Sequence, residues 1–314
     1  MKKLCLICGL IWGFSAYSEV LPLDDALRAT YNSCVGIDDK LSEYKTLAGI
    51  NTAVSGVGTG LGIGATAVGI VKYSTDKEAA SYEKLLEELR EQTKDVDYDE
   101  AASDADIAAF EKEFDLSYEA AVQDVDKYQS ELDKLNKKSK KLGNWRTGLL
   151  ATATATNVAG VILSANSGAS GEIQDMIDVC LEAVDNLTDS VLQAKLNGED
   201  VTEANEIIAA CREYKTVDAK SISKRAKGGE ISSAVGATTG LVGTIVSASA
   251  NSNKVRNDNT DKGKQKEKNL NVTANVMAGT TTVASAASTV FSATQIAAIK
   301  RVAIVAGQCE GVLK

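Results

Sequence analysis

Cysteine is the residue type whose number and spacing offer the clearest chemistry in this chain of 314 residues. The sequence contains six cysteines and no histidine. Without histidine it lacks the commonest general base and the commonest metal ligand, so a Ser–His–Asp or Cys–His catalytic arrangement is excluded. The remaining chemistry is disulfide formation, and it concerns Cys5, Cys8, Cys34, Cys180, Cys211 and Cys309.

The N-terminus has the features of a secretory signal peptide over residues 1–18. A basic start and a short apolar run at 4–14 precede Ala16 and Ser18, small residues at the positions that signal peptidase reads. The apolar run is too short to span a bilayer. Cleavage after Ser18 removes Cys5 and Cys8 and, with the loss of two lysines, takes the formal charge from −9 to −11. An even number of cysteines then remains in an exported chain, which favours disulfides.

The positions of the four remaining cysteines favour one pairing. The midpoint of Cys34 and Cys180 is residue 107, and that of Cys211 and Cys309 is residue 260. Both midpoints lie in polar, turn-like sequence, so each pair would close the base of a helical hairpin. Four cysteines allow three pairings, and the alternative of Cys180–Cys211 with Cys34–Cys309 would join the hairpins instead. A separate possibility is that the four cysteines form no disulfide and remain as free, buried thiols.

An acidic cluster is the only other group of residues suited to binding. Asp95, Asp97, Asp99 and Glu100 offer oxygen ligands of the kind that Ca²⁺ prefers. The cluster lacks the order of an EF-hand loop, so we interpret it as a solvated acidic turn. We therefore expect no enzyme, no cofactor and no metal site. The negative net charge argues against nucleic acid as a partner, because phosphate binding needs clustered positive charge.

Long helices are predicted for most of the chain, because Pro22 is the only proline and aromatic residues are few. One helix is predicted from about residue 40 to about residue 96. The segment 74–142 has the heptad seam of a coiled-coil hairpin, with a turn at 97–106. The seam comprises Tyr82, Leu85, Leu89 and Val96, then Phe110, Phe114, Tyr118, Ala121, Val125, Tyr128, Leu132, Leu135, Ser139 and Leu142. Traced backwards, it continues through Val71, Val68, Gly64, Leu61, Val57, Val54 and Ile50.

Four stretches contain no Asp, Glu, Lys or Arg: 46–71, 147–171, 231–253 and 269–299. With the cysteines they indicate two tandem helical hairpins. The first module, 19–195, has the coiled coil as its tip, and the second, 196–314, has a basic tip at 254–268. A turn at 197–200, where Gly198 fits a helix C-cap, joins the modules. The repeated order of features indicates an internal duplication. The predicted fold class is all-α, an elongated four-helix array with a coiled-coil extension.

The charge-free stretches are long enough for a bilayer. A helix apolar on all faces is buried or membrane-spanning, and about 20 residues suffice to cross. Glycines at every fourth position, as in a glycine zipper, allow helices to approach closely in lipid. These helix-packing glycines are Gly56, Gly60, Gly64, Gly236 and Gly240. Against a bilayer, the stretches hold many Ser and Thr residues and few large aliphatic ones, so insertion would be marginal.

Basic residues flank both hairpin tips and predict an orientation. The positive-inside rule places these tips in the cytoplasm, which leaves the cysteines on the periplasmic side of a bacterial inner membrane, where disulfides form. The basic residues are Lys134, Lys137, Lys138, Lys140, Lys141, Arg146, Lys254, Arg256, Lys262, Lys264, Lys266 and Lys268. Basic residues at 220–227 lie on the other side and weaken this orientation.

The sequence favours a non-enzymatic bacterial cell-envelope protein, in which a membrane-embedded four-helix bundle carries a projecting coiled coil with a structural or interaction role. The expected partners are the lipid bilayer and a protein bound through the coiled-coil arm, and a homo-oligomer is compatible with the glycine spacing. Two alternatives stay open. One is a secreted α-helical pore-forming or translocator protein, and the other is a soluble exported coiled-coil adhesin or scaffold.

Overall fold

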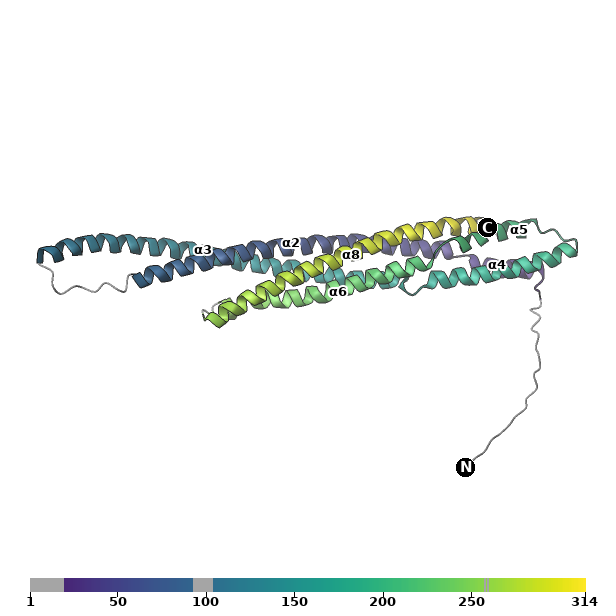
Figure 1. Cartoon of the computed structure of the whole chain (residues 1–314). Helices are drawn as coiled ribbons and strands as arrows, with labels where there is room; N and C mark the ends of the chain where they lie inside the picture. The colour runs from purple at the N-terminus through teal and green to yellow at the C-terminus, as the bar shows by residue number, and fades with distance from the viewer. Residues whose placement is uncertain (1–19, 93–103, 257, 259) are drawn as a thin grey trace, which may run out of the picture. The chain divides into compact units, whose positions relative to one another are not determined.

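The computed structural model describes the backbone of residues 20–92, 104–256, 258 and 260–314, and the side chains of all of these except 90, 92 and 104–122. No strand occurs among these residues, and the predicted all-α class with long, mutually packed helices is confirmed. The α-helices are α1 (Leu23–Cys34), α2 (Ile37–Gln92), α3 (Asp104–Ser164), α4 (Glu172–Leu196), α5 (Thr202–Arg212), α6 (Lys220–Ala250), α7 (Asn253–Arg256) and α8 (Asp261–Leu313) (Figure 1). A π-turn, η1 (Ala165–Ala169), follows α3, and a 3₁₀ turn, η2 (Glu213–Thr216), follows α5.

The chain forms two compact units, and neither coincides with a predicted module. The described part of one unit is 20–42, Glu172–Ala219 and Lys300–Lys314; it holds all four paired cysteines and is called the cysteine unit. The other, the bundle unit, is the described part of Glu43–Gly171 and Lys220–Ile299. Each unit draws residues from both sides of the predicted module boundary at 195/196. The turn that was expected at 197–200 is present next to this boundary. There α4 ends at Leu196, and Gly198 has a left-handed φ of 79°.

The cysteine unit has an ordinary apolar core. Along α4 the large buried side chains are aliphatic, and they recur at spacings of three and four. They are Ile173, Ile177, Val184, Leu187 and Val191. The opposite face of α4 exposes Asp175, Asp178, Glu182, Asp185 and Asp189. This pattern is typical of a helix that packs on one side and meets water on the other.

The bundle unit is built from α2, α3, α6 and α8, which run alongside one another (Figure 1). Glycines mark the close approaches between these helices. An ideal Cβ added at Gly58 of α2 would lie 2.7 Å from Thr156 of α3. A Cβ at Gly62 of α2 would lie 3.0 Å from the Cα of Thr282 on α8. Small residues thus set the spacing between the backbones.

The coiled-coil arm at the start of α3 and the end of α2 has its own apolar cluster, formed by Ala79, Leu86 and Leu132. The rings of Tyr82 and Tyr128 lie beside it, 5.9 Å apart between centroids. The predicted seam is confirmed for the described second arm, where Leu132 and Ser139 are buried. In the first arm Leu86 is buried instead of the predicted Leu85. The seam positions Phe110, Phe114, Tyr118, Ala121 and Val96, like the acidic cluster, lie outside the described side chains.

The second charge-free stretch does not form one continuous helix into α4. The helix breaks at 165–171, where Gly168 has φ 107° and Gly171 has φ 86°. Only glycine adopts this left-handed region without steric cost, so the absence of proline does not ensure continuity. Tyr44 packs against Gly168, and a Cβ there would lie 2.7 Å from its Cε2 atom. The left-handed backbone and the close contact with Tyr44 therefore both require glycine at position 168.

The buried face of α2 in its charge-free part also differs from the prediction. Ile50, Val57 and Val71, on the predicted seam, are exposed. The buried face lies one position further along, and it consists of Asn51, Ser55, Gly58, Gly62, Ala65, Gly69 and Lys72. One residue turns a helix by about 100°, so the apolar seam and the buried face are different sides of α2.

Candidate functional site

Along the charge-free stretches the interior of the bundle unit is made mainly of small and polar side chains, with Leu150 and Ile299 as the large apolar ones. On α6 the buried positions between Gly229 and Ser247 are Ser233, Gly236, Gly240 and Gly243, and they contain no large apolar residue. Helices in water normally bury their aliphatic face and expose their polar one. The described part of α6 does the opposite over its charge-free length.

Amide side chains join three helices at one end of the interior. Asn51 of α2 donates through Nδ2 to Ser164 Oγ of α3 and to Ser292 Oγ of α8, at 2.7 Å in both cases. Gln295 of α8 donates to the carbonyl oxygen of Ser167, at 2.5 Å. All five residues are buried, so these bonds satisfy polar groups that have no contact with water.

Hydroxyl groups continue this network toward the middle of the bundle. Ser288 Oγ lies 3.0 Å from Ser55 Oγ of α2 and 2.8 Å from Ser233 Oγ of α6. One turn further along α8, Ser285 donates to Asn157 Oδ1 of α3 at 3.0 Å. The four long helices are therefore held together through hydrogen bonds as well as through packing.

A thin apolar layer interrupts the polar interior. It consists of Ala65, Leu150 and Ala278, with Leu149 packed against it. Along α3, Leu150 lies between the amide of Asn157 and the guanidinium of Arg146. The layer separates the neutral hydroxyl network from a charged cluster at the other end of the charge-free stretches.

Arg146 is fully buried, and the side chains that accept its hydrogen bonds are neutral. Its Nε donates to Ser247 Oγ at 2.9 Å, and its two terminal nitrogens donate to Asn275 Oδ1 at 3.0 Å and Asn271 Oδ1 at 2.8 Å. Burying a charge is costly unless hydrogen bonds compensate for the lost water. Three side-chain acceptors provide this compensation, and Asn271 in turn reaches Asp76 at 3.5 Å.

A second buried cation, Lys72, completes the charged cluster. Its Nζ lies 2.6 Å from Asp76 Oδ2 and 3.8 Å from Glu267 Oε1. Ser139 donates to the other oxygen of Asp76, and Arg256 donates to Ser139 Oγ at 3.1 Å. Buried ion pairs of this kind stabilise little by themselves, but removal of one partner is costly. The cluster ties α2, α3, α7 and α8 together where the charge-free stretches end.

Large apolar side chains cover the outside of the bundle unit along the charge-free stretches. Ile245 of α6 is 58% exposed and Val283 of α8 is 70% exposed. The other exposed large apolar residues are Ile50, Val57, Ile63, Ile70 and Val71 on α2, Val158 and Ile162 on α3, Ile231, Val235, Leu241 and Val242 on α6, and Val272, Val276, Val290 and Phe291 on α8. No charged residue occurs in these stretches, so a wide apolar band surrounds a polar interior. Such a band marks a membrane or protein interaction surface.

The predicted helix-packing glycines fall into two groups. A Cβ at Gly236 would lie 2.6 Å from Asn157 Oδ1, and one at Gly240 would overlap Thr154, so both mark close contacts. Gly64 has room for a Cβ, with Leu149 at 3.6 Å. At Gly56 and Gly60 an added Cβ would meet no described atom within 4 Å. Within this chain the close contacts of α2 instead involve Gly58, Gly62 and Gly69.

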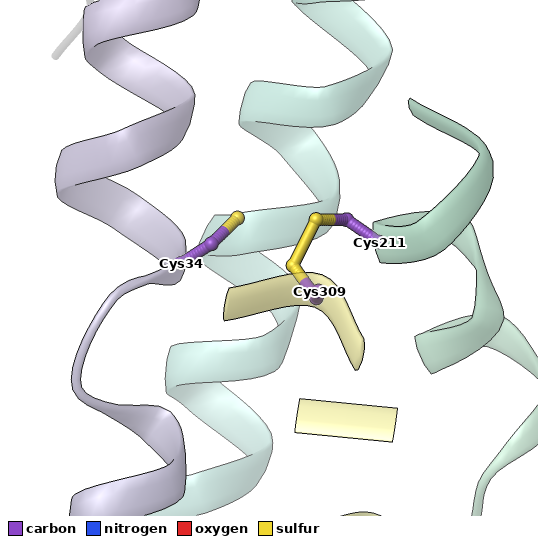
Figure 2. Close-up of side chains that lie close together, drawn as sticks. All are labelled: Cys34, Cys211 and Cys309. Carbon is purple, nitrogen blue, oxygen red and sulfur yellow. A yellow bond between two sulfur atoms is a disulfide. The ribbon is translucent and has the colours of Figure 1, made fainter. Parts of the chain in front are cut away.

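The cysteines carry the pairing that their spacing favoured. Cys34 is bonded to Cys180 and Cys211 to Cys309, with S–S distances of 2.00 and 1.99 Å. The sulfur atoms of Cys34, Cys211 and Cys309 lie within 4.8 Å of one another (Figure 2). That spacing resembles a metal centre, but disulfide sulfurs are not thiolates, and the thiolate is the form that binds metal.

The turns before α5 and α8 contain the same pair of hydrogen bonds, which a threonine donates to an aspartate two residues earlier. In the cysteine unit, the hydroxyl and backbone N–H of Thr202 donate to Asp200 at 2.7 and 3.0 Å and thereby lower the pKa of that carboxyl. Before α8, Thr260 makes the same two bonds to Asp258, at 2.6 and 3.2 Å, and lowers its pKa in the same way. Both aspartates stabilise the start of the helix that follows.

The polar interior was not predicted, although the sequence contains a signal for it. Asn51, Ser55, Gly58 and Gly62 follow helical spacing inside a charge-free stretch, and so do Gly236, Gly240 and Gly243. Reading polar and small residues as the packed face would have located the network. The prediction instead treated Ser, Thr and Asn only as residues that lower the hydrophobicity of a membrane span.

Comparison with protein-family models, curated proteins and solved structures found no match. The class of the molecule therefore rests on its own geometry. Within the residues that the structure describes, four helical segments are long and apolar enough to cross a membrane: Leu23–Leu89, Gln123–Leu196, Lys220–Ala250 and Asp261–Leu313. The chain is an all-α protein compatible with a membrane helical bundle.

Proposed function

We propose that this chain is a non-enzymatic protein of the bacterial cell envelope whose bundle unit lies in the inner membrane. The charge-free parts of α2, α3, α6 and α8 are the membrane-spanning segments. The coiled-coil arm projects beyond the bilayer and serves a structural role or binds a partner protein.

The inverted arrangement of the bundle unit carries this proposal. Hydroxyls and amides fill the interior, and aliphatic side chains such as Val283 and Ile245 face outward. In water this costs free energy twice, because apolar surface stays exposed and polar groups are buried. In lipid the same arrangement is favourable, because polar groups pair inside the bundle and small residues allow close helix packing.

The charged cluster fits one end of such a span. Lys72, Arg146 and Glu267 lie just outside the charge-free stretches, at the level where polar headgroups begin. Lysines on both hairpin tips support a cytoplasmic location for this end under the positive-inside rule. The cysteine unit, with its water-type exterior and two disulfides, then belongs in the oxidising periplasm.

Membrane fractionation tests the location. We expect the full chain to stay in the membrane pellet after carbonate extraction and to dissolve only in detergent. Orientation is tested with two single-cysteine additions at exposed positions, Gln193→Cys in the cysteine unit and Gln265→Cys on the basic tip. A membrane-impermeant maleimide should label Gln193→Cys in intact spheroplasts, and should label Gln265→Cys only after lysis. Recovery of the protein in the carbonate supernatant would overturn the proposal.

The polar interior also favours a second candidate, a secreted α-helical pore-forming or translocator protein. If the two hairpins separated, hydroxyls such as Ser55, Ser233 and Ser288 would be available to line a water-filled path. A soluble monomer that releases dye from liposomes would support this function over the first. A soluble protein that leaves liposomes intact would support the exported scaffold or adhesin.

A further inference from the structure

We propose that the four half-cystines form one thiol–disulfide exchange centre, in which a thiolate on Cys34 attacks the Cys211–Cys309 disulfide. This proposal concerns the cysteine unit alone and does not depend on the membrane location of the bundle unit. It gives the two disulfides a joint role, beyond the separate closure of two hairpins.

The geometry places one disulfide beside the other. Cys34 ends α1, Cys211 lies on α5 and Cys309 on α8, and their side chains point toward one another (Figure 2). The three sulfur atoms lie within 4.8 Å of one another, and the sulfur of Cys180 lies outside this group. Cys34 is therefore the member of its own disulfide that is adjacent to the second one.

Burial favours exchange within the chain over reaction with outside thiols. All four half-cystines are fully buried. Once Cys34 becomes a thiolate, the Cys211–Cys309 bond is already next to it, whereas an external thiol would first have to enter the core. The intramolecular reaction thus has a high effective concentration of its target.

The exchange step conserves both atoms and electrons. A dithiol reductant opens Cys34–Cys180 in the few molecules whose core it enters, and is itself oxidised to a disulfide; this slow entry is needed once, whereas the exchange that follows needs no outside thiol. The Cys34 thiolate then forms a bond to one sulfur of the second disulfide, and the Cys211–Cys309 bond breaks. The departing sulfur keeps the electron pair as a thiolate and takes a proton from solvent.

Exchange would change which parts of the chain are cross-linked. The bonds Cys34–Cys180 and Cys211–Cys309 each close one predicted hairpin, and within the described part of the chain the hairpins are connected covalently only through the main chain at 197–201. A bond from Cys34 to Cys309 or Cys211 would link the two hairpins directly. The cluster therefore acts as a redox-sensitive switch between hairpins closed separately and hairpins tied together.

A matched pair of variants tests the proposal. Cys180→Ala leaves Cys34 as the free thiol, and Cys34→Ala leaves Cys180, so both variants lose the same disulfide. Each purified variant is incubated at mildly alkaline pH without added thiol, quenched with acid and maleimide, and mapped by mass spectrometry of non-reduced peptides. We expect at least about tenfold more intrachain exchange in Cys180→Ala, seen as Cys34 peptides bonded to those of Cys211 or Cys309.

Equal exchange in the two variants, or a free thiol that stays on Cys34 in Cys180→Ala, would overturn the proposal. The wild-type chain provides a test that needs no substitution. A substoichiometric dithiol should yield Cys34 bonded to Cys211 or Cys309 among the partly reduced molecules. If the partly reduced chains contain only the two original disulfides and free thiols, the exchange centre does not exist.

Discussion

On α4 of the cysteine unit the buried face consists mainly of Ile, Val and Leu, and the exposed face carries Asp and Glu. On the charge-free part of α6 in the bundle unit the buried face consists of Gly, Ser and Ala250, and the exposed face carries Ile, Val and Leu. The cysteine unit therefore buries large apolar side chains on α4, whereas the bundle unit exposes them on α6 and buries small and polar ones. The difference supports the proposal that the cysteine unit is built for water and the bundle unit for lipid.

The physical reason is the source of the association energy. In water, burial of aliphatic surface stabilises by about 25 cal/mol per Å², so large side chains belong inside. In lipid this term vanishes between helices, and close backbone packing and hydrogen bonds hold the bundle together. Gly58, Gly62 and Gly236 supply the packing, and Asn51, Asn157 and Ser288 supply the hydrogen bonds. Matched substitutions, which apply the same kind of change to both kinds of surface or core, test this interpretation.

The largest effect is expected from a core truncation in the cysteine unit. Leu187→Ala removes a fully buried aliphatic side chain and should lower the free energy of unfolding by about 2–5 kcal/mol. The matched change in the bundle unit, Ser233→Ala, should cost about 0.6 kcal/mol, because only a membrane-type hydrogen bond is lost. Denaturation in detergent, followed by circular dichroism, compares the two. A larger loss from Ser233→Ala would contradict the assignment.

The second effect concerns the outer surfaces. Val283→Asp places a carboxylate on the apolar band and should disfavour membrane insertion by about 3 kcal/mol, a roughly hundredfold shift toward the carbonate-soluble fraction. Leu192→Asp is the control, since Leu192 is exposed to the same extent as many band residues but lies in the cysteine unit. Its distribution should be unchanged. Equal effects from the two variants would show that the surfaces do not differ.

The third effect separates packed glycines from open ones on α2. Gly62→Ala brings a Cβ within 3.0 Å of the Cα of Thr282, so the two backbones must move apart at a cost of about 1–3 kcal/mol. Gly60→Ala, two residues away, has free space and should stabilise the helix by up to about 1 kcal/mol. Thermal melting in detergent gives both values. The opposite order would place the helix contact on the Gly56 and Gly60 face.

A smaller effect is expected from the amide network. Asn51→Ala removes the donors to Ser164 and Ser292 and should lower stability by about 1 kcal/mol, which is within the range measured for hydrogen bonds between membrane helices. Asn186→Ala, on an exposed site of the cysteine unit, serves as the control and should be close to neutral. Equal melting temperatures for the wild type and Asn51→Ala would show that the network adds no stability.

The smallest effect is a pH dependence at the turn before α5. The pKa of Asp200 is lowered because Thr202 donates two hydrogen bonds to its carboxylate. A lowered pKa in the folded state means that this stabilisation is present above the ordinary aspartate pKa and is lost as pH falls through the lowered one. The protection factor for hydrogen exchange at the first turn of α5, which is the intrinsic rate at each pH divided by the observed rate, should therefore fall on acidification. Asp200→Ala should show the lower protection factor at all pH values.

Much of the architecture was predictable because local patterns determine it. The long α2, the turn at 197–200, the second coiled-coil arm with Leu132 and Ser139, and the pairing of Cys34 with Cys180 all follow from periodicity and spacing. These features depend on residues close in sequence, or on two arms of equal length. Breaks such as that at Gly168 were missed, because left-handed glycines are not visible from composition.

The site itself was predicted only in part. The charge-free stretches lie on α2, α3, α6 and α8, and Gly236 and Gly240 lie at close contacts with α3. The face of α2 was wrong, since the apolar seam through Ile50 and Val57 was assumed to point inward. The assumption that apolar residues point inward holds for α4 and for the described second arm of the coiled coil. It fails where the packed face is built from Asn51, Ser55 and Gly58.

The sequence alone determined that this chain forms long charge-free helices, with polar tips and cysteines spaced for two cross-links, because charge, periodicity and spacing are properties of the chain itself. Only the tertiary structure decided which face of each helix is buried, that Arg146 and Lys72 share the interior with amides, and that two disulfides lie side by side. Each of these contacts depends on how a helix is rotated about its own axis relative to the helices packed around it. A rotation of about 100° changes every contact while it leaves the sequence pattern the same.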